Sequence, residues 1–140
     1  MVGLPGVGRR SLFGLLTRTV GVSTSHATRV GVLRIPDPRL ENVARIQGSR
    51  KVTPATLEFV LVPSLVRGES SERLDLPALR SVDVLVHVVR AFRDPSVPHV
   101  EGSVDPARDI ELVELELVLA DLSVIEKRID RLRADAQKGK

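Results

Sequence analysis

A glycine-rich stretch near the N-terminus has residue types and spacing that could bind phosphate. Gly3 and Gly8 are separated by four residues, and a predicted helix follows them. Phosphate-binding loops use this spacing, because their backbone N–H groups and the following helix N-terminus surround the anion. The candidate nucleotide-binding residues are Gly3, Leu4, Pro5, Gly6, Val7, Gly8, Arg9, Arg10 and Ser11. The spacing alone is equally compatible with a glycine turn that binds no ligand.

Two arginines follow the second glycine. In a working loop, a lysine at the first of these positions reaches the β and γ phosphates, and a serine or threonine at the second ligates magnesium. Arg9 keeps the positive charge, but its planar fork is bulkier than an ammonium group and is not expected to curl over the loop. Arg10 cannot ligate a cation. We therefore expect a weakened phosphate site, no metal ligand here and no catalytic residue.

The elements that must position this loop alternate along the chain. Residues 29–35, 57–63 and 82–89 are apolar and β-branched runs that predict strands buried on both faces. Residues 11–19 and 38–47 predict helices between them. This alternation predicts an α/β fold with a mainly parallel sheet, whose ligands bind at the carboxyl ends of the strands.

A long amphipathic helix is predicted from Pro106 to about residue 136, with Asp105 as its N-cap. Apolar side chains recur along it every three or four positions: Leu115, Val118, Leu119, Leu122, Ile125, Ile129 and Leu132. A stripe of this length needs a partner. It either packs on the sheet or pairs with another chain, as a protein partner or a second copy.

Composition limits the remaining possibilities. The chain has 140 residues, no cysteine and no apolar run of the roughly 20 residues that cross a bilayer, so we expect one core, a cytoplasmic protein and no membrane partner. The three histidines lack zinc spacing; His87 is expected in the core, and His99 is expected to brace the turn into the long helix. Lysine and arginine cluster near both ends, which predicts either an RNA or ribosome contact or a solvated face.

Several segments resemble the Obg-like ATPase (YchF) family in the family's own order. They are residues 3–11, 36–40, 52–60, 65–68 and 99–106, with the similarity continuing to residue 128. The resemblance implies a TRAFAC-class P-loop domain over residues 1–104 and the first helix of a coiled-coil insertion over residues 105–140. It also implies binding of ATP in preference to GTP, slow hydrolysis and association with ribosomes.

The chain departs from the family pattern at the positions that hold phosphate and metal. Leu61 replaces the magnesium-shell aspartate of the second switch, and Ser64 replaces the glycine that contacts the γ-phosphate. Ser25 or Thr28 could offer the first switch a hydroxyl. Only two residues precede the loop where the family has a central strand, and the adenine-reading motif is absent, so we expect a marginally stable sheet unless an upstream segment supplies that strand.

Three functions fit these observations. The first is a nucleotide-binding, ribosome-associated NTPase with hydrolysis lost or strongly impaired, which would bind ATP or GTP with a poorly held magnesium. The second is a catalytically dead pseudo-NTPase that serves as a protein or RNA interaction module. The third is a gene remnant without a function.

Overall fold

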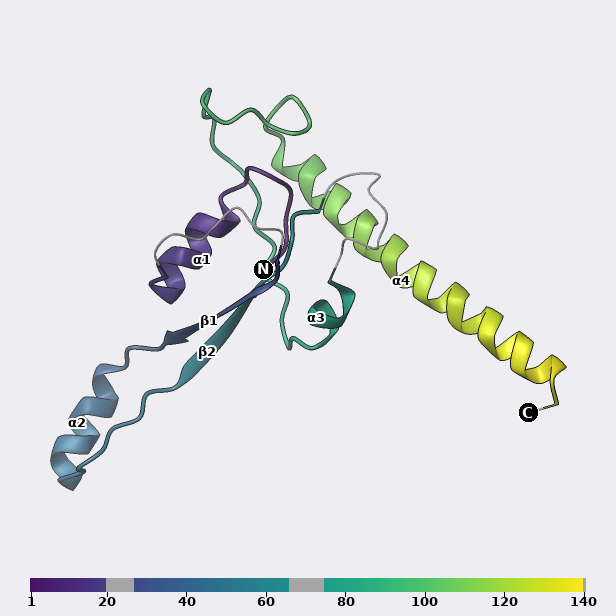
Figure 1. Cartoon of the computed structure of the whole chain (residues 1–140). Coiled ribbons are helices and arrows are strands. Elements are labelled where there is room, and N and C mark those ends of the chain that lie inside the picture. Colours follow the sequence, from purple (N-terminus) through teal and green to yellow (C-terminus); the bar gives the residue numbers. More distant parts are fainter. Residues whose placement is uncertain (20–26, 66–74, 140) are drawn as a thin grey trace.

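The structure is a computed structural model that describes residues 1–19, 27–65 and 75–139. Its elements are α1 (Arg9–Thr17), β1 (Arg29–Arg34), α2 (Pro38–Gln47), β2 (Thr56–Leu61), α3 (Leu76–Arg80) and α4 (Pro106–Gln137). In Figure 1, a small body around the N-terminus carries two extensions, an arm made of β1, α2 and β2 and the long helix α4. The α/β class is confirmed, and α3 is an element that the sequence pattern did not predict.

The two named strands are antiparallel, so the prediction of a mainly parallel sheet is wrong for them. Arg29 pairs with Leu61, and Arg34 pairs with Thr56. The cause is the path of the chain, because α2 lies at the tip of the arm and the chain returns alongside β1 (Figure 1). A parallel pair would need a crossover connection over the face of the sheet.

Parallel pairing occurs at the N-terminus. The Val2 N–H donates to Val86 O at 2.9 Å, and the Val88 N–H donates to Val2 O at 3.0 Å, which makes a single parallel bridge between Val2 and His87. Among the described residues, the predicted strand at 82–89 forms only this isolated bridge, because Val2 is the one residue that pairs with it. On the other side, the Leu65 N–H donates to Gly3 O at 3.2 Å. The first residues therefore pair on both sides.

The arm strands are covered on one face only, which corrects the prediction that they are buried on both. Val30 and Val32 remain 60% and 52% exposed. Helix α1 covers the other face, and it approaches closely because Gly31 has no side chain: a Cβ there would overlap Phe13 and Thr17.

The core lies beneath the glycine loop. One buried cluster contains Val2, Leu4, Val7, Val62, Leu65 and Val113, and a second contains Met1, Phe13 and Leu61. Apolar residues of the loop itself are thus part of the core, and this packing fixes the loop backbone against the segment that follows β2.

Helix α4 confirms the predicted boundary, since the Asp105 carboxylate accepts from the Arg108 N–H at 3.2 Å. Its first turns join the core through Val113, which is 1% exposed. Farther along, the helix projects away from the body (Figure 1), and Leu122 and Ile125 of its apolar stripe are about half exposed. The stripe therefore does not fold back on the sheet. None of the described helices is long and apolar enough to span a membrane.

Candidate functional site

The glycine loop leads directly into α1, which begins at Arg9 rather than at the predicted Ser11. Gly6 and Gly8 have φ angles of 73° and 91°, backbone conformations that favour glycine. Gly8 is the N-cap, and no described side chain caps the helix there. The first N–H groups of an α-helix have no partner within the helix and carry a partial positive charge, and a helix N-terminus of this kind is suited to binding an anion.

A pocket of about 360 Å³ lies beside this loop, within the size range of small-molecule sites. Its lining residues are Leu4, Gly6, Val7, Gly8, Arg9, Arg10, Ser11, Ser64, Phe92, Asp94 and Val97. Of the nine predicted site residues, the structure brings seven to this pocket and leaves Gly3 and Pro5 out of its lining. Sequence reasoning did not assign Phe92, Asp94 or Val97, because nothing in the local pattern shows that the segment after Val88 folds back over the loop.

Arg9 is bound to its own chain. Its Nη1 donates to Val62 O at 2.9 Å and to Pro63 O at 3.3 Å, and its Nη2 donates to Ser64 Oγ. The side chain does not curl over the loop; it reaches past the loop to the segment after β2. Arg9 is only 5% exposed, and burial, followed by the charge of Arg10, lowers its pKa to about 10. The guanidinium therefore remains cationic at neutral pH.

Magnesium is the ion that this class of loop usually holds with phosphate, and the residues here fit it poorly. Ser64 Oγ already accepts a hydrogen bond from Arg9, and Asp94 Oδ1 accepts from the N–H and the hydroxyl of Ser96. Leu61 is buried in the core and carries no oxygen on its side chain. Thr28 donates to Asp75 and does not line the pocket, and Ser25 lies outside the described residues. No group of three acidic, histidine or cysteine side chains within the described ranges could hold a metal.

The far wall of the pocket is organised by Arg90, which is 1% exposed. Its guanidinium donates to three backbone carbonyls, those of Phe92, Val97 and Asp94, at 3.1, 2.8 and 3.1 Å. It also lies 5.0 Å from the centroid of the Phe92 ring, within the range of a cation–π contact. One buried side chain thus sets the course of the loop that faces the helix N-terminus.

Two buried side chains brace this loop against α4. His99 Nδ1 accepts from the Glu101 N–H at 3.2 Å, and His99 Nε2 lies 2.9 Å from Asp109 Oδ2, although the two groups are not aligned as a regular hydrogen bond. Asp109 Oδ1 accepts from Arg108 Nη2 at 2.8 Å. The prediction that His99 braces the turn into the long helix is confirmed.

His87 is half-buried and belongs to neither buried cluster, so it lies at the edge of the core and not, as predicted, within it. Burial lowers its pKa below 6.5, while the negative charges of Glu114 and Asp109 oppose that change. The acids come from α4, an element distant in sequence, so the local pattern gave no sign of them.

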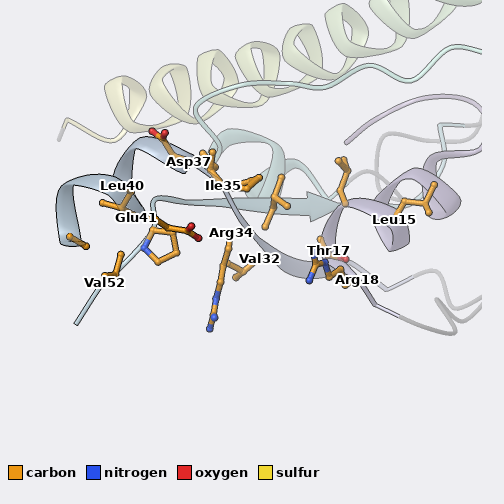
Figure 2. Close-up of a pocket in the computed structure, with 15 residues that line it drawn as sticks. Leu15, Thr17, Arg18, Val32, Arg34, Ile35, Asp37, Leu40, Glu41 and Val52 are labelled. Atoms are coloured by element: carbon orange, nitrogen blue, oxygen red, sulfur yellow. The ribbon is translucent and has the colours of Figure 1, made fainter. Parts of the chain in front are cut away.

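A larger groove of about 990 Å³ lies apart from the glycine loop, between the end of α1, strand β1 and helix α2. Figure 2 shows Leu15, Val32, Leu40 and Val52 among its walls, with Arg34 at the rim. Its lining is mostly apolar, and it contains none of the predicted phosphate-binding residues. The larger volume of this groove is not by itself evidence that it binds the nucleotide.

The fold and the loop define an α/β protein in which a glycine-rich turn joins a paired N-terminal segment to a helix with an uncapped N-terminus. No family model matches the chain. It is 40% identical to the protein named ribosome-binding ATPase YchF of Bacillus subtilis, over 94% of this chain and 38% of the relative. It is 40% and 39% identical to proteins of the same name from Haemophilus ducreyi and Escherichia coli O157:H7, over 99% of this chain and 41% of each relative.

The chain belongs to the YchF family, and it spans about 40% of the length of the curated relatives that it matches.

Proposed function

We propose that this chain is a P-loop nucleotide-binding protein that holds the phosphates of ATP or GTP between the glycine loop and the loop organised by Arg90. The observation that carries the proposal is the pocket itself: the uncapped N-terminus of α1 opens into it, and two arginines line it. The relatives' printed name, which describes an ATPase, supports the same ligand class.

We propose further that hydrolysis is lost or strongly impaired. Phosphoryl transfer depends on a positioned cation and on groups that stabilise the charge of the transition state. The metal position of the loop is occupied by Arg10, and Arg9 is held by three acceptors of its own chain. These residues therefore favour nucleotide binding without hydrolysis.

Ribosome association in the cytoplasm is also part of the proposal, because the relatives are named as ribosome-binding. The basic surface for an RNA contact is the arm rather than the glycine loop, since Arg9 is buried. Between residues 27 and 65 there are six lysines or arginines and three acidic residues. Phosphates of RNA would meet this excess of positive charge.

An interaction module without nucleotide is the second candidate, and one observation favours it. The apolar stripe of α4 is exposed along the helix beyond its first turns. Such a stripe is expected on a helix that pairs with a partner in a coiled coil. In the proposed division, residues 1–104 form the partial nucleotide domain, and residues 105–140 form this helix.

The test is titration of the purified chain with a fluorescent ATP analogue and with ATP as competitor. Arg10→Glu places a negative charge in the pocket and is expected to abolish saturable binding, because like charges repel at the helix N-terminus. Arg45→Glu makes the same change on the exposed face of α2 and should leave binding unchanged. The absence of binding by the folded natural chain would refute the nucleotide proposal and favour the interaction module.

A further inference from the structure

We propose that the loop pocket selects the metal-free form of a nucleotide polyphosphate, so that magnesium competes with binding instead of assisting it. This inference rests on the proposed nucleotide function and concerns the chemical form of the ligand. The guanidinium groups of Arg9 and Arg10 supply the positive charge that a bound cation supplies in other phosphate loops.

The pocket carries an excess of positive charge. Arg9, Arg10 and Asp94 are the charged side chains among the lining residues that the structure describes, and they leave a net positive site. Arg10 lies close enough for its charge to lower the pKa of Arg9, so the two cations already repel each other. A magnesium ion would add two positive charges to this cluster. A polyphosphate without metal instead brings its full negative charge to both guanidinium groups.

Hydrogen-bond donors remain available beside the glycine loop. A guanidinium has five N–H donors. Arg9 uses Nη1 for Val62 O and Pro63 O and one Nη2 hydrogen for Ser64 Oγ, which leaves at least Nε–H and the second Nη2–H without a partner among the described residues. The nearby N–H groups at the start of α1 also lack a described side-chain cap. These donors suit phosphate oxygens and offer nothing to a cation.

The pocket offers few oxygens that could ligate magnesium. Magnesium requires near-octahedral oxygen coordination and gives up its water reluctantly, so a protein site supplies at least one well-placed carboxylate or hydroxyl beside the phosphates. Two of the four side-chain oxygens that line the pocket are already engaged, Asp94 Oδ1 by Ser96 and Ser64 Oγ by Arg9. Recruiting either oxygen to a metal would break hydrogen bonds that position the two walls of the pocket.

The experiment compares the binding of a fluorescent ATP analogue in EDTA and in excess magnesium. The natural chain is expected to bind at least about tenfold more tightly in EDTA, because each guanidinium then meets the uncompensated charge of the phosphates. Inorganic tripolyphosphate should displace the probe in EDTA. The Arg10→Ser variant restores a hydroxyl at the metal position and removes one cation, so it should lose the preference for EDTA or reverse it.

Arg10→Gln removes the same charge without adding a metal ligand, and it should lose the preference for EDTA without gaining one for magnesium. Tighter binding of the natural chain in magnesium would overturn this inference and leave the nucleotide proposal intact. No binding in either buffer, with the chain folded by circular dichroism, would overturn both. Equal affinity in the two buffers would refute competition by magnesium.

Discussion

Arg9 and Ser64 join the glycine loop to the segment that follows β2, because Arg9 Nη2 donates to Ser64 Oγ across 55 residues of sequence. The same guanidinium holds the carbonyls of Val62 and Pro63. These contacts are made by the protein alone. The glycine loop and the segment after β2 are therefore connected before any ligand binds.

Replacing Arg9 by methionine tests whether this bridge stabilises the fold. Arg9→Met keeps the apolar stem but leaves the buried carbonyl of Val62 without its donor. An unsatisfied buried acceptor costs about 1–3 kcal/mol, so the free energy of unfolding in urea should fall by that amount. Arg45→Met, on an exposed helix face, is the matched control and should change it little. An equal effect of both variants would contradict a structural role for Arg9.

The Asp109 carboxylate is expected to hold α4 to the body. Asp109→Asn keeps the shape of the side chain but removes the charge that faces Arg108 and His99. Because Arg108 is partly exposed, the expected loss is moderate, about 1–3 kcal/mol in the free energy of unfolding. Asp121→Asn changes an exposed carboxylate on the same helix and should stay within about 0.5 kcal/mol of the natural chain. Similar losses of stability in Asp109→Asn and Asp121→Asn would show that the contacts of Asp109 with His99 and Arg108 contribute nothing specific.

His87 should make stability depend on pH in weakly acidic solution. Burial lowers its pKa in the folded state below 6.5, so the unfolded state takes up a proton first as the pH falls. Stability from this group is fully present above pH 6.5 and is lost progressively as the pH falls toward the lowered folded pKa. Glu114 and Asp109 reduce the effect without reversing it.

The measurement is urea unfolding at neutral and at weakly acidic pH for the natural chain and for His87→Gln. The variant should lose less stability on acidification, since glutamine does not titrate. An identical decline in both proteins would assign the pH dependence to other groups.

Arg90 should control the far wall of the pocket. Arg90→Met removes the donors to Phe92, Val97 and Asp94, so the loop should lose its fixed course and nucleotide affinity should fall at least about tenfold. The neighbouring Arg93 is exposed, and Arg93→Met is the control that should retain the affinity of the natural chain. Unchanged affinity in Arg90→Met would mean that this wall does not touch the nucleotide.

Gly3 should tolerate no side chain. Its φ is 147°, and a Cβ would overlap Val88 O in the paired segment. Gly3→Ala is therefore expected to lower the melting temperature more than Gly48→Ala, whose φ of 59° costs about 1 kcal/mol but whose Cβ would meet nothing within 4 Å. Thermal unfolding followed by circular dichroism makes the comparison. A smaller effect at Gly3 would contradict its close approach to Val88.

The helices were the most predictable elements of this fold. The boundaries of α2 and the start of α4 follow from Asp37 and Asp105, which cap their helices with their own carboxylates, and from the proline after each. These signals lie within one turn of the chain. Two of the three predicted strands were located nearly as well, whereas the third, at 82–89, forms only an isolated bridge in the structure. The direction of pairing was not predicted, because it depends on where α2 turns the chain.

Local sequence determined the glycine loop, the two arginines in its first helical turn and membership of the YchF family, since these depend on residue types and their order. Tertiary structure decided the rest of the site. The guanidinium of Arg9 could point into the pocket or toward Ser64, and only the burial of Leu61 and Val62 beneath the loop brings those acceptors within its reach. The wall formed by Arg90 and the acids beside His87 depend likewise on contacts between segments far apart in the chain, which no local pattern encodes.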